Sequence, residues 1–137
     1  MPQITVDFSA SLSDRFDRRG FALALHALTA EAVDVSVETC KTRFRRVEET
    51  FVADGAPEHA VVHVDLALLP GRTEEVRARL SRAVLDLVRE YTDAGPDAVV
   101  HWSVDVTELT EAYTKYVGAQ ASTVGPAGPV GPVSTGR

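Results

Sequence analysis

The chain opens with an alternation of polar and hydrophobic residues. Residues 3–8 read Gln-Ile-Thr-Val-Asp-Phe, a period of two that is typical of a half-buried strand. The pattern predicts a strand over residues 1–8, with Ile4, Val6 and Phe8 on the side that faces a core.

A period of three to four residues follows a polar turn at residues 9–13. It predicts a helix over residues 14–33, in which Gly20 is a weak point because glycine is a poor helix former. The apolar stripe of this helix consists of Phe21, Leu25, Leu28 and Ala32.

Residues 39–52 are predicted to form a strand that carries several basic side chains. Lys41, Arg43 and Arg45 have the same parity, so a regular strand directs them to one face, and it directs Arg46 to the other. A charged strand of this kind is also a common way to protect the edge of a sheet, which is the structural alternative for these residues.

The second half repeats the order strand, helix, strand. The strands are predicted at residues 60–69 and 98–108, and the helix runs from a cap at Thr73 to about Glu90. Its core stripe consists of Val76, Leu80, Ala83, Val84, Leu87, Val88 and Tyr91. A short polar and aromatic segment, residues 109–117, comes last.

Two strand-helix-strand units predict an α+β fold with a four-stranded sheet and both helices on one face. We expect the opposite face of the sheet to carry apolar side chains and therefore to favour self-association. The composition changes near residue 119, where Gly-Pro pairs begin to recur. The sequence thus predicts one domain over residues 1–118 and a disordered Gly/Pro-rich tail over residues 119–137.

Composition and charge limit the classes of function that the chain can have. The chain has 137 residues and a net charge of −6, which argues against general binding to nucleic acid. No apolar run is long enough to cross a bilayer, and the N-terminus does not have the layout of a signal peptide, so we expect a cytoplasmic protein. Cys40 is the only cysteine, which excludes an internal disulfide and a cysteine metal cluster.

Pro2 is the first candidate for chemistry. Methionine before a small residue is usually removed, and the chain would then begin with a secondary amine held at the end of a strand. Such an amine can act as a general base if its pKa lies near the working pH. The structural alternative is that Pro2 only promotes removal of Met1.

Several short stretches together resemble the tautomerase superfamily, and most closely the 5-carboxymethyl-2-hydroxymuconate isomerases. They are residues 1–9, 41–46, 53–55, 62–64 leading to Gly71-Arg72, and 106–109. Each motif is weak alone, but their order and spacing are fairly specific. The resemblance covers nearly everything before the tail.

The resemblance implies a homotrimer and an isomerase that needs no metal or organic cofactor. It implies that Pro2 is the base and that the substrate is an unsaturated 2-hydroxy or 2-oxo di- or tricarboxylate from aromatic catabolism, with 5-carboxymethyl-2-hydroxymuconate as the first choice. Carboxylate binding is assigned to Arg72, Arg43, Lys41 and Arg46. Lys41 departs from the family pattern, where an arginine is expected; lysine keeps the charge but loses the planar fork.

Two other functions fit the same residues. A cationic proline serves dehalogenation or decarboxylation in related enzymes, and a trimeric binding module without catalysis would retain Met1. Packing or structural roles are expected for the remaining candidates, which are His26, Cys40, Phe51, His63 and Trp102.

Overall fold

The first strand lies inside the sheet. In this computed structural model, which describes residues 1–119, β1 (Gln3–Ser9) pairs with a neighbour on each side. Ile4 and Val6 are fully buried and Phe8 is 3% exposed, as the alternation predicts. The predicted tail lies outside the described residues, apart from Ala119.

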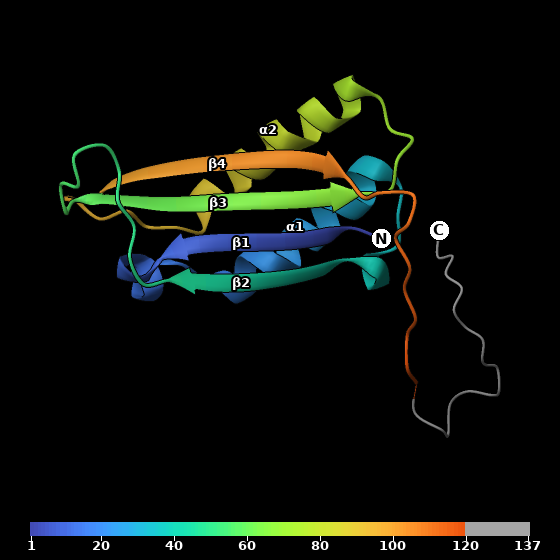
Figure 1. Cartoon of the computed structure of the whole chain (residues 1–137), viewed down its shortest axis with the longest axis horizontal. Coiled ribbons are helices and arrows are strands. Elements are labelled where there is room, and N and C mark those ends of the chain that lie inside the picture. The colour runs from blue at the N-terminus through green and yellow to red at the C-terminus, as the bar shows by residue number, and fades with distance from the viewer. Residues whose placement is uncertain (120–137) are drawn as a thin grey trace.

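Two strand-helix-strand units form the domain. β2 (Lys41–Val47) runs parallel to β1, and β4 (Val99–Glu108) runs parallel to β3 (His59–Leu68). The central strands β1 and β3 are antiparallel, so the order is β2-β1-β3-β4. The helices α1 (Arg18–Val33) and α2 (Glu74–Glu90) cover one face of the sheet (Figure 1), which confirms the predicted α+β architecture.

The first helix begins later than predicted. A short 3-10 helix, η1 (Ala10–Arg15), occupies most of the predicted turn, and Phe16 then makes an isolated bridge to Thr92. The side chain of Asp17 accepts a hydrogen bond from Gly20 N at 3.0 Å and so caps α1. Burial of the Phe16 side chain in the core requires an extended backbone there, which interrupts the helix.

Gly20 is the residue that permits this cap. A methyl group at its Cα would collide with the Asp17 carboxylate and would lie 2.8 Å from the Tyr91 ring. The predicted weak point of the helix is therefore a site of close approach between the start of α1 and the end of α2.

The basic strand is shorter than the predicted range of 39–52. It starts after a second 3-10 helix, η2 (Val37–Thr39), and ends at Val47, which is paired with Ser9. Beyond Ser9 the chain enters η1, so the residues after Val47 have no strand to pair with.

The core lies between the sheet and the two helices. α2 begins as predicted, because the Thr73 hydroxyl accepts a hydrogen bond from Val76 N at 3.2 Å. The fully buried side chains come from β1, β3, η1 and both helices; the largest are Phe21, Ile4, Leu12, Leu25, Leu66, Leu68 and Leu80. No helix described between residues 1 and 119 is long and apolar enough to span a membrane.

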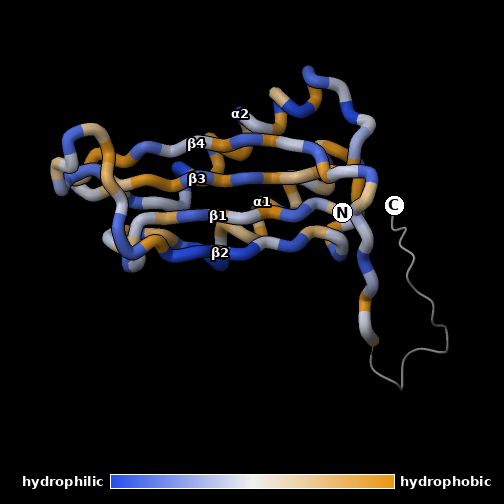
Figure 2. The backbone as a smooth tube through the Cα atoms, viewed as in Figure 1, coloured by the Kyte–Doolittle hydropathy of each residue, from blue (hydrophilic) through white to orange (hydrophobic). Residues whose placement is uncertain are grey.

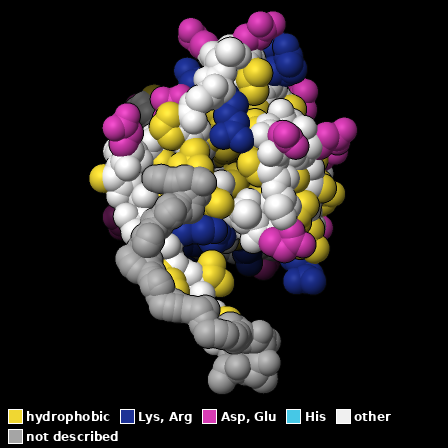
Figure 3. Space-filling model, turned by 90° about the vertical axis from the view of Figure 1, so that its right-hand side faces the viewer, with side chains coloured by type: hydrophobic (Ala, Val, Ile, Leu, Met, Phe, Trp, Pro, Cys, Tyr) yellow, Lys and Arg dark blue, Asp and Glu magenta, His cyan; other side chains and the backbone are white. Residues whose placement is uncertain are grey.

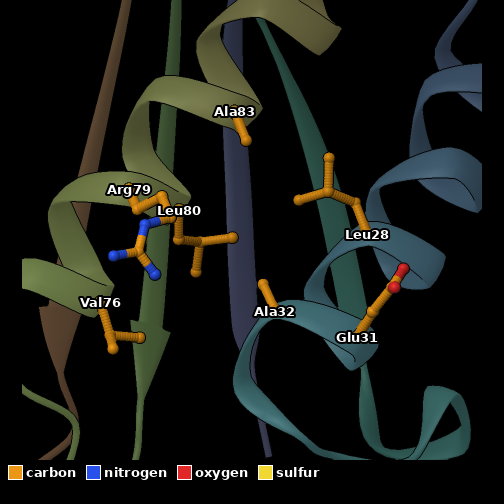
Figure 4. A pocket seen from close by; sticks show the side chains of 7 residues that line it. All are labelled: Leu28, Glu31, Ala32, Val76, Arg79, Leu80 and Ala83. Atoms are coloured by element: carbon orange, nitrogen blue, oxygen red, sulfur yellow. The ribbon is translucent and has the colours of Figure 1, made fainter.

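A groove of about 260 Å³ remains where α1 meets α2. Figure 4 shows mostly aliphatic side chains along it, with Glu31 and Arg79 as its charged members. Its lining consists of Leu28, Glu31, Ala32, Val76, Arg79, Leu80 and Ala83. None of the predicted site residues belongs to it.

The sheet face opposite the helices is polar, so the expected apolar face is wrong. Polar side chains pair across it: Arg45 with Asp7 at 2.7 Å, His63 with Ser103 at 2.6 Å, and His59 with His101 at 2.9 Å. Figure 2 shows the hydrophilic character of the basic strand β2. Each strand turns its apolar residues toward the helices, which leaves the polar half of every alternation on this face.

Candidate active site

Pro2 lies directly before β1 and is buried. Its carbonyl accepts a hydrogen bond from Lys41 N at 3.2 Å, at the first residue of β2. Because β1 and β2 are parallel, both strands start at the same end of the sheet, where Figure 1 places the N-terminus. Pro2 is thus held by backbone pairing at a fixed point of the scaffold.

The amino group at this end has a lowered pKa. In the structure it belongs to Met1, so it stands one residue away from the amine that Pro2 would present after removal of the methionine. Burial is the largest cause, followed by the positive charges of Arg72, Lys115 and Lys41, while Cys40 acts in the opposite direction. Desolvation and nearby cations both disfavour the ammonium form, so this environment favours a neutral amine.

Arg72 is anchored by backbone carbonyls. Its Nη2 donates to Val33 O at 2.7 Å, and its Nη1 donates to Leu69 O at 3.4 Å. Val33 is the last residue of α1, so the guanidinium lies at the negative end of that helix, where a cation is favoured. Gly71 supplies the preceding turn with a φ of +127°, a conformation that only glycine adopts readily.

Arg43 lies on the polar face of the sheet, next to the residue that follows Pro2. Its Nη1 donates to Gln3 Oε1 at 3.0 Å, and Gln3 Nε2 in turn donates to the Tyr113 hydroxyl at 3.1 Å. Arg43 is exposed, and it keeps further N–H donors for a ligand.

The two other predicted binding residues lie at opposite ends of β2. Lys41 is at the start of the strand, near Pro2, and its Nζ donates to Thr39 O at 3.0 Å. Arg46 is paired in register with Phe8, near the far end of β1, and its Nε lies 3.5 Å from Glu48 Oε2. Within one chain the structure brings Arg72, Lys41 and Arg43 toward Pro2 and leaves Arg46 at the other end of the strand.

The segment that follows β4 contributes two residues that the sequence patterns did not indicate. Tyr113 contacts Gln3, and Lys115 is close enough to the terminal amine to lower its pKa. In Figure 1 this segment, in orange, passes beside the N-terminus. Figure 3 looks onto this end and shows Lys or Arg side chains with hydrophobic side chains between them.

Most of the remaining candidate residues pack against or bond to helices and strands; Phe51 is the exception. His26 Nε2 lies 2.8 Å from Thr42 Oγ1 and joins α1 to β2, and burial lowers its pKa. Cys40 is buried, and burial raises the pKa of its thiol. Trp102 packs against the core. Phe51 does not pack in the core, because it is 78% exposed on the loop after β2.

Several solved structures have a similar fold. A 5-carboxymethyl-2-hydroxymuconate isomerase from Deinococcus radiodurans R1 matches with a TM-score of 0.74 and 23% identity, over 86% of this chain and 90% of that chain. A fused 4-OT described as a symmetric trimer matches with a TM-score of 0.67 and 18% identity, over 88% and 99% of the two chains.

A third similar structure is N1, a member of the cis-3-chloroacrylic acid dehalogenase family. It has a TM-score of 0.58 and 21% identity, over 83% of this chain and 80% of its own. These structures show the fold of the tautomerase superfamily. Comparison with curated proteins gave no significant match in sequence.

The family follows from the sequence itself. A family model described as 5-carboxymethyl-2-hydroxymuconate isomerase matches residues 2–119, from Pro2 to the end of the described chain. The chain belongs to this family, which confirms the resemblance seen in the short motifs and supports an isomerase-type enzyme.

Proposed function

We propose that the protein is a cofactor-independent isomerase that uses the amine of Pro2 as its general base. The reaction moves a proton from the 2-hydroxyl oxygen of a conjugated dienol to a carbon of the same chain. The C=C bonds shift and a 2-oxo product forms, while Pro2 takes up the proton and returns it. The observation that carries the proposal is that Pro2 is buried next to a terminal amine, that of Met1, whose pKa is lowered by burial and by the charges of Arg72, Lys115 and Lys41.

The proposed substrate is an unsaturated 2-hydroxy di- or tricarboxylate, with 5-carboxymethyl-2-hydroxymuconate as the first choice. Two considerations support it: the family to which the chain belongs, and the excess of cations around Pro2 in a chain of net charge −6. Cations near the amine would bind substrate carboxylates and stabilise negative charge that develops on the 2-oxygen. Arg43 and Lys41 are the proposed carboxylate ligands, while Arg72, whose half-buried guanidinium is held by two backbone carbonyls, is proposed to act mainly through its charge.

Arg46 joins the proposed binding set only through assembly. We propose a homotrimer, in line with the symmetric trimer described for the fused 4-OT. In a trimer, a residue at the far end of β2 can serve the site of a neighbouring subunit even though it is remote from Pro2 in its own chain.

The pKa of the amine separates this proposal from its closest rival. Dehalogenation of the hydration type needs a cationic proline, and burial among cations disfavours that form. As a base, Pro2 must be neutral, so activity should rise as the pH increases through the pKa of the amine and then reach a plateau. If the reaction needed a cationic proline, the pH–rate profile would instead fall as the pH rises through the pKa of the amine.

The test combines intact mass with an ultraviolet assay on 2-hydroxymuconate and 5-carboxymethyl-2-hydroxymuconate. We expect a mass that lacks Met1, measurable turnover, and a fall of about 10²–10⁴-fold in kcat for Pro2→Ala, the usual contribution of a general base.

Pro57→Ala is the matched control, because Pro57 is exposed on the loop that leads into β3. It should behave as the unaltered protein does. A retained Met1 in an inactive protein would support the non-catalytic binding module instead, and unchanged turnover in Pro2→Ala would remove Pro2 from the mechanism.

A further inference from the structure

The segment after β4 is held across the end of the sheet that carries Pro2. Leu109 N donates to Leu68 O at 2.6 Å, and Tyr113 N donates to Thr110 O at 3.1 Å, so the segment leaves the sheet through a fixed turn. Tyr113 is half-buried, and its hydroxyl reaches the side chain of Gln3. A residue from one end of the described chain is thereby placed next to the residue that follows Pro2.

The amide of Gln3 has only one orientation that fits its neighbours. A guanidinium has no acceptor, so the amide atom that faces Arg43 must be the oxygen, Oε1. The amide nitrogen Nε2 then faces Tyr113 and donates to its hydroxyl oxygen. Since the Tyr113 oxygen is the acceptor in this bond, its own proton remains available for another partner.

We propose that Tyr113 donates this proton as a hydrogen bond to a carboxylate oxygen of the bound substrate, beside Arg43. Gln3 is the positioning residue that holds the hydroxyl and the guanidinium on the two sides of one amide. This inference rests on the proposed function, because it assigns a residue to the carboxylate binding of that same site.

The contrast with Arg72 supports the assignment. Two N–H groups of Arg72 bond the Val33 and Leu69 carbonyls, which hold this half-buried guanidinium against the backbone. Arg43 is exposed, and within the described part of the chain its guanidinium bonds a single acceptor, the amide oxygen of Gln3, through Nη1. A phenol and a guanidinium with uncommitted donors form a suitable pair for the planar oxygens of a carboxylate.

The first experiment measures binding rather than turnover. Adipate, a saturated dicarboxylate with the chain length of muconate, is titrated calorimetrically into the full-length protein and its Tyr113→Phe variant. We expect the dissociation constant to rise about tenfold or more, since hydrogen bonds to charged groups contribute about 1.5–3 kcal/mol. Tyr116→Phe is the matched control: Tyr116 is 69% exposed, and its substitution should leave the constant unchanged.

A second variant separates positioning from simple packing. Gln3→Glu can still accept from Arg43, but it offers the Tyr113 hydroxyl an acceptor and so diverts its proton from the substrate. We expect Gln3→Glu to weaken adipate binding, and the double variant with Tyr113→Phe to bind no more weakly than Gln3→Glu alone. Independent, additive losses would contradict the role of Gln3 as the positioning residue.

Failure of this inference and failure of the proposed function give different results. If Tyr113→Phe binds adipate as tightly as Tyr116→Phe does, Tyr113 is not a carboxylate ligand, whatever the turnover of the unaltered protein. If Pro2→Ala retains full turnover, the proposed base is wrong, although Tyr113→Phe can still weaken binding. The thermal unfolding midpoint of each variant is compared with that of the unaltered protein. An unchanged midpoint shows that the measured effects come from the folded protein.

Discussion

At the scale of single residues, sequence motifs indicate the candidate site residues that lie on or next to regular elements. Pro2 and Lys41 stand at strand starts, and Arg72 follows the glycine of a strand-to-helix turn. Lys115 and Tyr113 have no such signal, because they lie on an irregular segment with no periodicity. They meet the N-terminus through tertiary structure, since Gln3 and Tyr113 are 110 positions apart in the chain, and a local pattern carries no information about that contact.

Lys115 provides a test of what lowers the pKa of the terminal amine. Its positive charge lowers the pKa of the terminal amine, so Lys115→Gln should raise that pKa. The rising limb of the pH–rate profile should then move to higher pH, and the plateau rate should change less than the rate on the limb.

The matched control is Arg82→Gln, which removes a cation from an exposed position on α2. Its profile should superimpose on that of the unaltered protein. A limb that stays in place in Lys115→Gln would show that burial alone sets the pKa.

At the scale of elements, periodicity predicts which segments are helices and strands, and local contacts decide where they end. The long apolar stripes of α1 and α2 and the alternation in β1, β3 and β4 are all visible in the sequence. The late start of α1 depends on the burial of Phe16, and the early end of β2 depends on where its partner β1 ends. Both are tertiary effects, which is why the predicted boundaries differ there.

Gly20 tests the cap of α1. Alanine normally stabilises a helix relative to glycine, but here its methyl group would collide with the capping carboxylate of Asp17 and with the Tyr91 ring. We expect Gly20→Ala to lower the free energy of unfolding by about 1–3 kcal/mol, the usual effect of overpacking.

Gly118→Ala is the comparison in denaturant unfolding, because no atom of residues 1–119 lies within 4 Å of a methyl group at that position. It should leave the stability unchanged. A more stable Gly20→Ala variant would mean that the Asp17 side chain can move aside without loss of stability. The higher helix propensity of alanine would then outweigh the steric clash.

At the scale of the whole molecule, the predicted order of elements is confirmed and the predicted character of the open sheet face is not. The information was present in the sequence, since polar residues such as Asp7, His63 and Ser103 occupy the positions that face away from the helices. What the sequence patterns did not show is that these residues line up across the sheet and pair with one another. If the proposed trimer forms, a polar face offers it hydrogen bonds and ion pairs rather than apolar contact.

Dilution tests the proposed assembly. We expect sedimentation velocity to show a trimer that dissociates on dilution, and turnover to fall in parallel if neighbouring subunits complete each site. Because the open face exposes few apolar side chains, released subunits should remain dispersed, and both signals should recover on concentration. Full activity in a preparation that sediments as a monomer would show that one chain suffices.

The double attachment of Arg72 has a consequence for how this enzyme can change. One side chain ties the end of α1 to the approach of α2 and also contributes positive charge beside the terminal amine. A substitution of Arg72 would therefore weaken the packing between α1 and the start of α2 and would also remove a positive charge near the terminal amine. New substrate preferences are therefore expected to arise on the irregular segment around Tyr113 and Lys115, whose residues lie outside the helices and strands.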